Sequence, residues 1–475
     1  MNIFTPILSF FDHLHHFLWS PVMLATFFAI GCSYTIQTHF FQFRFFSLWW
    51  KNTMGSLFSS SHHKKSAGSV SPFAAMSAAL AGSMGIGNIA GVATALVAGG
   101  PGAIFWMWIS ALLGMMTKYA EILLGLKFRF KDKNQQWFGG PMVYLKEGLH
   151  SPFFSAFFSI CCLLASFGMG NMTQSNSMAD VLSHTLHIPP LYTGILTAVI
   201  TAIVILGGMN RIATISSILI PFMSILYLFF SFIVICANVT SLPFALFSIF
   251  QYAFRPSSIT GGAAGYCMMR ALRLGVSRGV FSNEAGLGSS VMAHASSSVS
   301  EPAIQGMWGI FEVFVDTIVV CTITALVLLT SGVYNVSLYE TALLTKTSLP
   351  NGVVLASQAF SSVLGNFGES FVAFSTVIFA FATLIAWAHY GQQCSRYLFG
   401  EKSIFWYKLL FLCFIIIGCL IRVEVVWEIS DTFNALMAVP NLIALAFLSH
   451  YVIEDTNRYL ANITIFHRPT YHKKS

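Results

Sequence analysis

Residues 82–91 are the part of this sequence best suited to hold a small polar solute. They read Gly-Ser-Met-Gly-Ile-Gly-Asn-Ile-Ala-Gly and interrupt an otherwise apolar stretch. Glycine lets the backbone approach a solute closely, and Asn88 adds a side-chain oxygen or amide. Where a membrane helix unwinds, its carbonyl groups can coordinate a cation and its N–H groups a carboxylate. Close helix packing is the alternative, because Gly87 and Gly91 have the i, i+4 spacing of contacting membrane helices.

The stretch 168–180 is unusually polar for a membrane helix. It contains Asn171, Gln174 and Asp180, which we expect to face the interior of a helix bundle. Gln174 can bond an amino or carboxylate group of a solute, or merely a neighbouring helix.

One face of a later apolar stretch combines hydroxyl groups and aromatic rings. Thr376, Thr383, Trp387 and Tyr390 follow one another at spacings of seven, four and three residues, which places them on a single helical face. The two hydroxyl groups suit the coordination of an ion, and Trp387 would wall off a small pocket. In the alternative reading, the hydroxyl groups bond their own backbone and the rings fill the core.

Several charged residues lie within apolar stretches. Glu312 and Asp316 are four residues apart with no Lys or Arg beside them, so they are candidates to carry protons, face a water-filled vestibule or pair with a distant cation. Lys118 and Glu121 lie near the end of a predicted span, where we expect snorkelling and pairing. Among the histidines, only His389 is predicted to lie deep.

The sequence contains no recognisable catalytic motif. It has no His-x-x-x-His pair, Gly-x-Ser-x-Gly motif or phosphate-binding loop. Its nine cysteines form no Cys-x-x-Cys pair and read as small buried hydrophobes. We therefore expect no catalytic residues, no enzymatic activity and no organic cofactor.

The composition indicates an integral membrane protein. The chain has 475 residues, of which 56% are hydrophobic and 9% are charged, whereas about 25% of the residues of a soluble domain are charged. A net charge of +7 is explained by orientation in a membrane rather than by nucleic-acid binding. With no basic residue before Arg44 and no cleavage-type site, the first apolar stretch is expected to be retained as a span.

About eleven apolar windows approach the roughly 20 residues that span a bilayer. They fall near 17–36, 70–98, 102–126, 153–179, 191–207, 212–236, 257–280, 306–330, 371–398, 404–421 and 432–451. We predict an N-terminal span and cytoplasmic linker (1–69), a first five-helix repeat (70–236), an extracellular connection (237–256), a second five-helix repeat (257–451) and a cytoplasmic tail (452–475). The second repeat begins with a Gly-rich span that holds Gly261, Gly262 and Gly265 and ends in Asn283-Glu284-Ala285-Gly286-Leu287-Gly288. Glycine-interrupted segments at matching positions of two inverted halves indicate a transporter's central site.

The basic residues predict an orientation. Most fall in alternate loops, which places the N-terminus outside and the C-terminus in the cytoplasm. The cytoplasmic group comprises Arg44, Lys51, Lys64, Lys65, Lys127, Arg129, Lys131, Lys133, Lys146, Arg211, Arg270, Arg273, Arg278, Arg396, Lys402, Lys408 and the tail, and the outer group Arg255, Lys346 and Arg422.

Four motifs resemble the hallmarks of the alanine or glycine:cation symporters, the bacterial sodium–alanine symporter family. They are residues 99–114 (GGPGAIFWMWISALLG), 85–92 (GIGNIAGV), 282–289 (SNEAGLGS) and 168–176 (GMGNMTQSN). The resemblance implies a LeuT-like fold of five-plus-five inverted repeats with one extra N-terminal helix, small neutral amino acids (alanine and glycine) as substrates, and sodium as the coupling ion.

The resemblance also implies site residues. Gln174, Thr383 and Trp387 match pocket positions of the family, and Gly85, Gly87, Asn88, Gly261, Gly262 and Gly265 would complete the substrate site. Carbonyl groups around Gly82 and Gly85, with Thr376 or Thr383, would hold sodium. The chain departs from the family pattern at Ile86, at Gln392 and at Ala263, which leaves ion choice and substrate preference open.

Together, these observations predict sodium-driven uptake by alternating access in the bacterial inner membrane. The expected partners are a small neutral amino acid, sodium and the lipid bilayer, without nucleic acid and with the chain acting as a monomer. Three rivals stay open. They are proton coupling through Glu312 or Asp316, a channel, and an intramembrane enzyme, which the missing catalytic groups disfavour.

Overall fold

The fold is largely helical, with one two-stranded β-hairpin in the part of the chain that is described. The computed structural model describes residue 14 and residues 18–58, 69–254, 263–345, 347, 349–421 and 423–466. Its elements are α2 (Pro21–Gln37), α3 (Phe41–Arg44), α4 (Phe46–Asn52), α5 (Met54–Leu57), α6 (Pro72–Ser83), η1 (Ile86–Asn88), α7 (Ala90–Gly99), α8 (Gly102–Lys127), β1 (Phe130–Lys131), β2 (Trp137–Phe138), α9 (Pro141–Glu147), α10 (Pro152–Phe167), η2 (Gly168–Met172), α11 (Thr173–Leu186), α12 (Pro190–Leu206), α13 (Gly208–Ala237), η3 (Val239–Ser241), α14 (Leu242–Phe254), α15 (Ala263–Asn283), α16 (Val291–His294), α17 (Pro302–Val313), η4 (Phe314–Cys321), α18 (Thr322–Thr330), α19 (Val336–Thr345), α20 (Gly352–Leu364), α21 (Asn366–Phe399), α22 (Ser403–Leu420), α23 (Val423–Phe447) and α24 (Ser449–Phe466).

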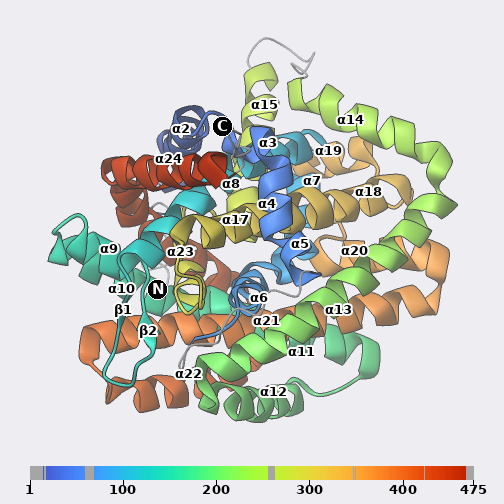
Figure 1. Cartoon of the computed structure of the whole chain (residues 1–475). Helices are drawn as coiled ribbons and strands as arrows, with labels where there is room; N and C mark the ends of the chain where they lie inside the picture. The colour runs from blue at the N-terminus through green and yellow to red at the C-terminus, as the bar shows by residue number, and fades with distance from the viewer. Residues whose placement is uncertain are drawn as a thin grey trace.

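The helices pack as two groups with α6 between them. In one group, α8 packs against α15 and α17; in the other, α21 packs against α10 and α11, and α12 packs against α22. Figure 1 shows α12 and α22 side by side at one edge of the molecule. Helix α6 contacts α17 from the first group and α21 from the second, so it lies between the two groups.

The chain breaks between α6 and α7, as the glycines predict. Helix α6 ends at Ser83, Gly85 has φ −117° and ψ −147°, and a single 3-10 turn precedes the restart at Ala90. All ten residues of the segment 82–91 are buried. Non-helical backbone at membrane depth survives only inside protein or beside a cavity, so this break is a structural feature that the fold must support.

A second break follows α15. Residues 284–290 are irregular, and three of them have left-handed backbone, namely Glu284 (φ 56°), Gly286 (φ 92°) and Gly288 (φ 78°). The second unwound segment therefore lies at the end of the predicted seventh span. Gly261 and Gly262 lie outside the described residues. Gly265 is in the first turn of α15, about 27 Å from Asn283 at 1.5 Å per residue, so it does not join the break.

Fewer than eleven single helices in the described part of the chain are long and apolar enough to cross a membrane by themselves. Among the described residues, six helices are long and apolar enough to cross a membrane, or seven if the bent pair Ser430–Phe447 and Ser449–Ile463 is one span. Several predicted spans are not among them because their helices are short. Helix α6 has 12 residues, α7 has 10, and α2 and α12 have 17 each. The chain is an all-α protein with multiple apolar spans, and the count of eleven and the domain boundaries stay predictions.

The predicted sidedness is wrong for three arginines. Arg270, Arg273 and Arg278 line a cavity together with Ala98, which lies near the end of α7. They therefore share a side with the α7–α8 turn, whereas Arg129 and the hairpin follow the opposite end of α8. The error came from treating residues 257–280 as a complete crossing, while α15 runs from one face only to the second break.

Candidate functional site

The first break contacts α21 and α11 at Gly85. A β-carbon added to Gly85 would lie 2.5 Å from Thr383 Oγ1 and 3.4 Å from Gln174 Oε1. The Thr383 hydroxyl donates to the Ala81 carbonyl oxygen at 3.0 Å, an acceptor in the last turn of α6. Gln174 donates to the Met169 carbonyl oxygen at 3.2 Å, while its own buried Oε1 accepts no hydrogen bond from the described residues. These three predicted residues are thus brought together, with an unused acceptor aimed at the break.

Asp316 joins the first break to the end of α15. Its carboxylate accepts hydrogen bonds from Asn88 Nδ2, the Ser282 hydroxyl and the Thr317 hydroxyl, each at 2.8 Å. All of these side chains are buried. In the described part of the chain, no basic side chain lies within 4.0 Å of Asp316, and Asn88 Oδ1 accepts no hydrogen bond. The result is a buried negative charge beside an unused carbonyl oxygen.

Trp387 connects α21 with the second break. Its indole Nε1 donates to Glu284 Oε1 at 3.1 Å, and the other carboxylate oxygen of Glu284 accepts from the Ser289 hydroxyl. The indole also lies against Gly170 in the π-helical turn of η2, where a β-carbon would overlap the ring. The predicted pocket residue Trp387 is therefore packed between a helix bulge and the unwound segment.

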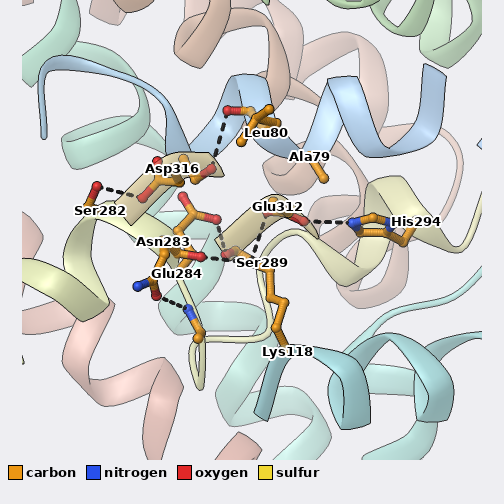
Figure 2. Close-up of polar contacts among 12 residues, drawn as sticks. Ala79, Leu80, Lys118, Ser282, Asn283, Glu284, Ser289, His294, Glu312 and Asp316 are labelled. Carbon is orange, nitrogen blue, oxygen red and sulfur yellow. Dashed lines mark hydrogen bonds and ion pairs between the residues drawn. The ribbon is translucent and has the colours of Figure 1, made fainter. Parts of the chain in front are cut away.

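A buried ion-pair network contacts the start of the second break at Asn283. Lys118 Nζ lies 3.2 Å from Glu312 Oε1 and donates to the Asn283 carbonyl oxygen at 3.0 Å. Glu312 Oε2 lies 2.8 Å from His294 Nε2, and Figure 2 shows the Glu312 carboxylate reaching toward the His294 ring. His294 Nδ1 is 2.8 Å from Gln305 Nε2. This chain of contacts holds α8, α15, α16 and α17 together.

The sequence predicted part of this network, because pairing with a distant cation was one of the alternatives for Glu312 and Lys118 is that cation. Lys118 and Glu121 are both fully buried, so neither snorkels to a membrane surface, although Lys118 does pair with Glu312. Glu121 accepts from Asn441 Nδ2 at 2.5 Å. His294 is also fully buried, so His389 is not alone in lying deep. The signal that could have found His294 is its position five residues after the end of the motif at 282–289.

Some predicted site residues do not join the others. Thr376 is buried with an unpartnered Oγ1, but it lies two turns from Thr383, about 10 Å along α21. One ion therefore cannot contact both hydroxyl groups. Asp180, predicted to face the interior, is 61% exposed and lies 3.4 Å from His184, because α11 extends beyond the bundle there.

The packing alternative for the glycines holds at one position. A β-carbon on Gly82 would lie 2.7 Å from the Tyr390 hydroxyl, so Gly82 permits a close approach of α6 and α21. At Gly87 the nearest atom would be 3.5 Å away, and at Gly91 no atom lies within 4 Å. The i, i+4 pair Gly87 and Gly91 therefore does not mark a tight helix contact.

Two cavities lie at opposite ends of the broken helix α6–α7. One of about 350 Å³ is bordered by Ala98 near the end of α7. The other, of about 290 Å³, is bordered by Val70 just before α6, and His389 and Arg396 of α21 also line it. The buried polar groups of the first break lie between these two cavities along the chain.

These atoms suit a hard monovalent cation and a small zwitterion better than a transition metal. The available ligands are carboxylate, amide, hydroxyl and backbone oxygen atoms, which hard cations prefer. Among the described residues, no group of three or more His, Cys, Asp or Glu side chains could hold a metal ion. Transporters use the carbonyl groups of unwound helix segments to hold ions and helix N-termini to hold the anionic group of a substrate.

Comparison with known proteins identifies the chain's relatives. Residues 5–473 match the profile of the sodium:alanine symporter family. The chain belongs to that family. It is 38% identical to the sodium/alanine symporter AgcS of Methanococcus maripaludis over 95% of this chain and 97% of AgcS. It is also 31% identical to the amino-acid carrier protein AlsT of Bacillus subtilis over 93% of this chain and 90% of AlsT.

Membership of the sodium:alanine symporter family confirms the resemblance found in the sequence. This family member is a multi-pass membrane protein of cation-coupled amino-acid transport. The manganese transporter of Eremococcus coleocola has a related fold, with a TM-score of 0.51 and 16% identity over 81% of this chain and 78% of that one. In this chain, the breaks at 84–89 and 284–290 are the segments that could place ligands.

Proposed function

We propose that this symporter takes up small neutral amino acids, with alanine and glycine as the expected substrates, together with sodium. The observation that carries the proposal is the position of Asp316. Its buried carboxylate is bonded by Asn88 from the first break and by Ser282 from the end of α15. A cation at this carboxylate would tie both broken helices together, so cation binding and the shape of the substrate site would be coupled.

Sodium fits the atoms around Asp316. Asn88 Oδ1 is buried and accepts no hydrogen bond from the described residues, and the Ser282 and Thr317 hydroxyl oxygen atoms lie within hydrogen-bond distance of the carboxylate. A buried carboxylate without a cation is costly. This site differs from the one expected around Gly82, Gly85 and Thr383, which the carbonyl groups at the end of α6 still support as a second candidate.

The amino acid would occupy the unwound backbone beside α21. Gly85 lets the unwound backbone lie directly against Thr383 and Gln174. The Oε1 atom of Gln174 has no hydrogen-bond partner among the described residues and suits the substrate ammonium. N–H groups at the start of α7 suit a carboxylate because the first N–H groups of a helix have no partner within the helix. Trp387 and Asn88 would form walls of the pocket. A pocket that the backbone approaches this closely favours small side chains such as those of alanine and glycine.

Alternating access would connect this site with each side of the membrane in turn. The cavities bordered by Ala98 and by Val70 lie at the two ends of the broken helix. One sodium ion crossing 100 mV contributes about 2.3 kcal/mol, and a tenfold sodium gradient adds about 1.4 kcal/mol. Together, they allow an accumulation of several hundredfold.

The proposal includes the finer points of architecture and location. We assign a LeuT-like arrangement of five-plus-five inverted repeats, in which the breaks at 84–89 and 284–290 occupy matching places. We place the protein in a bacterial inner membrane as a monomer. The end of the molecule with Lys127, Arg129 and Arg396 carries most basic loop residues, so it would face the cytoplasm.

Uptake into proteoliposomes tests the proposal. We expect labelled alanine and glycine to accumulate when sodium is higher outside, and not when potassium or choline replaces sodium. Proton coupling is the second candidate, favoured by the continuous contacts from Lys118 through Glu312 to His294. Accumulation that persists without sodium and collapses with a protonophore would establish that candidate instead. Counterflow of preloaded alanine excludes a channel.

A further inference from the structure

The chain turns sharply between α2 and α3. His39 and Phe40 both have left-handed backbone, with φ of 54° and 59°, a conformation that costs a residue with a side chain roughly 1–2 kcal/mol. Buried Gln42 holds the turn, because its Nε2 donates to Thr35 Oγ1 at 3.0 Å and to the Leu112 carbonyl oxygen at 3.3 Å. The turn is therefore a supported feature of the fold, and it fixes where α3 and α4 lie.

Helices α3 and α4 lie across the bundle, within the depth of the membrane. The ring of Phe41 lies 5.3 Å from that of Tyr119, which is eight residues, or about 12 Å, before the end of α8 at Lys127. The ring of Trp50 lies 6.2 Å from that of Phe311, and in Figure 1 α4 runs across α17 rather than alongside it. Since α8 is about 39 Å long and the hydrocarbon core about 30 Å thick, this segment lies in the half of the membrane toward Lys127, near the edge of that core.

The outward side of α3 and α4 is both apolar and basic. Arg44 and Lys51 are exposed, and among the described residues no carboxylate forms an ion pair with either. Residues 59–68, which follow the described part of this segment, contain no Asp or Glu and cannot neutralise the two cations. Exposed aromatic residues flank the cations, with between 41% and 53% of their surface accessible, namely Phe40, Phe43, Phe46 and Trp50.

We propose that α3 and α4 form a surface that binds anionic phospholipids of the adjacent leaflet, the cytoplasmic one in the orientation proposed above. Arg44 and Lys51 pair with the phosphate groups, and the exposed rings contact the acyl chains. Unpaired cations at this depth are costly, and basic residues among exposed rings are typical of helices that lie at the membrane boundary and attract anionic lipids. Because Trp50 packs against Phe311, the residue before Glu312, the bound lipid also supports α17.

Thermal unfolding of the purified full-length protein in detergent tests the lipid surface. Added phosphatidylglycerol should raise the unfolding midpoint of the parent protein more than phosphatidylcholine with the same acyl chains. In R44Q/K51Q, the phosphatidylglycerol concentration that gives half of this shift should rise at least tenfold, which corresponds to about 1.4 kcal/mol of lost binding. The matched control K133Q/K402Q removes two exposed cations from loops outside the segment and should respond as the parent does. Equal responses of R44Q/K51Q and the parent protein, or equal shifts from the two lipids in the parent, would overturn the proposal.

Two further measurements separate lipid binding from a structural role and from a site for soluble anions. Without added lipid, R44Q/K51Q should unfold close to the midpoint of the parent protein, because both side chains are exposed; a clearly lower midpoint would assign them a structural role and contradict the proposal. The variant R44K/K51R keeps both charges and should keep the lipid response. Glycerol phosphate carries the headgroup charge without acyl chains and should produce no shift; a shift equal to that from phosphatidylglycerol would make this a soluble-anion site. No transport is required, so the lipid surface and the proposed uptake can fail independently.

Discussion

Replacing Gly85 with alanine should reduce transport, because the added methyl group overlaps Thr383 at the first break. The new β-carbon would lie 2.5 Å from Thr383 Oγ1, whereas ordinary contacts begin at 3.4 Å, so an atom must move by roughly 1 Å. Thr383 cannot turn away easily, since it is β-branched and its hydroxyl donates to the Ala81 and Phe379 carbonyl oxygen atoms at 3.0 and 3.1 Å. Overpacking costs about 1–3 kcal/mol and a lost hydrogen bond about 0.5–1.5 kcal/mol.

The sum, about 1.5–4.5 kcal/mol, is the cost to the native conformation of the site. A conformation that becomes about 1.4 kcal/mol less favourable is populated about tenfold less. We expect G85A to reduce sodium-driven alanine uptake by at least tenfold in proteoliposomes with matched protein content. The control is G55A in α5, because its new β-carbon would lie no closer than 3.4 Å to another atom and α5 is not part of the break. Since alanine favours helix by about 1 kcal/mol over glycine, G55A should keep its uptake and unfold at the same or a higher temperature.

A double variant distinguishes a steric effect from general damage. In G85A/T383A, the hydroxyl oxygen is gone, and the remaining β-carbon at position 383 lies 3.5 Å from the new one, an ordinary contact. We expect its thermal unfolding midpoint to return toward that of the parent protein, while uptake stays low because Thr383 is a predicted ligand. Equal uptake by G85A and the parent protein would refute the placement of the solute at this break.

Three other substitutions test the buried charges. K118M removes the lysine partner of Glu312 and leaves its carboxylate with His294 alone, which should cost about 3–5 kcal/mol of stability. K118M/E312Q should unfold at a higher temperature than K118M alone, and equal midpoints would contradict the ion pair. D316N keeps the size of the side chain but removes its charge. The sodium concentration that gives half-maximal uptake should therefore rise at least tenfold, which corresponds to about 1.4 kcal/mol of lost sodium binding. Unchanged sodium dependence would exclude Asp316 as the cation ligand. W387F removes the hydrogen-bond donor to Glu284 and should lower stability in thermal unfolding by about 1–3 kcal/mol. Adding E284Q should recover part of that loss. An unchanged unfolding midpoint in W387F would argue against the hydrogen bond.

The sequence predicts features with a local cause. The break at 82–91 follows from glycine density within an apolar stretch, and both the break and the burial of Asn88 are confirmed. The shared face of Thr383, Trp387 and Tyr390 follows from helical spacing alone, and all three side chains are buried. Such patterns need no knowledge of which helix lies opposite.

Features that depend on distant partners were missed or misplaced. Lys118 donates to the carbonyl group of Asn283, which is 165 residues away in the sequence. Without knowledge of that partner, a lysine in an apolar stretch indicates the end of a membrane helix rather than a position in the protein core. The arginines of α15 were assigned to the wrong side because residues 257–280 were treated as one complete crossing, and local composition does not show at which face of the bundle a helix begins. The position of a break within a Gly-rich region depends on what supports the freed backbone, and here Lys118 and Trp387 provide support at 283–284.

Two hydrogen bonds at the site join α21 to α6 and to the second break. From α21, Thr383 donates to the Ala81 carbonyl oxygen and Trp387 donates to Glu284. The contacts within the first group are charged and fully buried, as in the pair of Lys118 with Glu312. Under the proposed cycle, the first group would therefore move as a unit, because breaking its buried ion pair costs more than exchanging a neutral hydrogen bond. A solute that replaces or strengthens the crossing contacts would then decide which cavity opens.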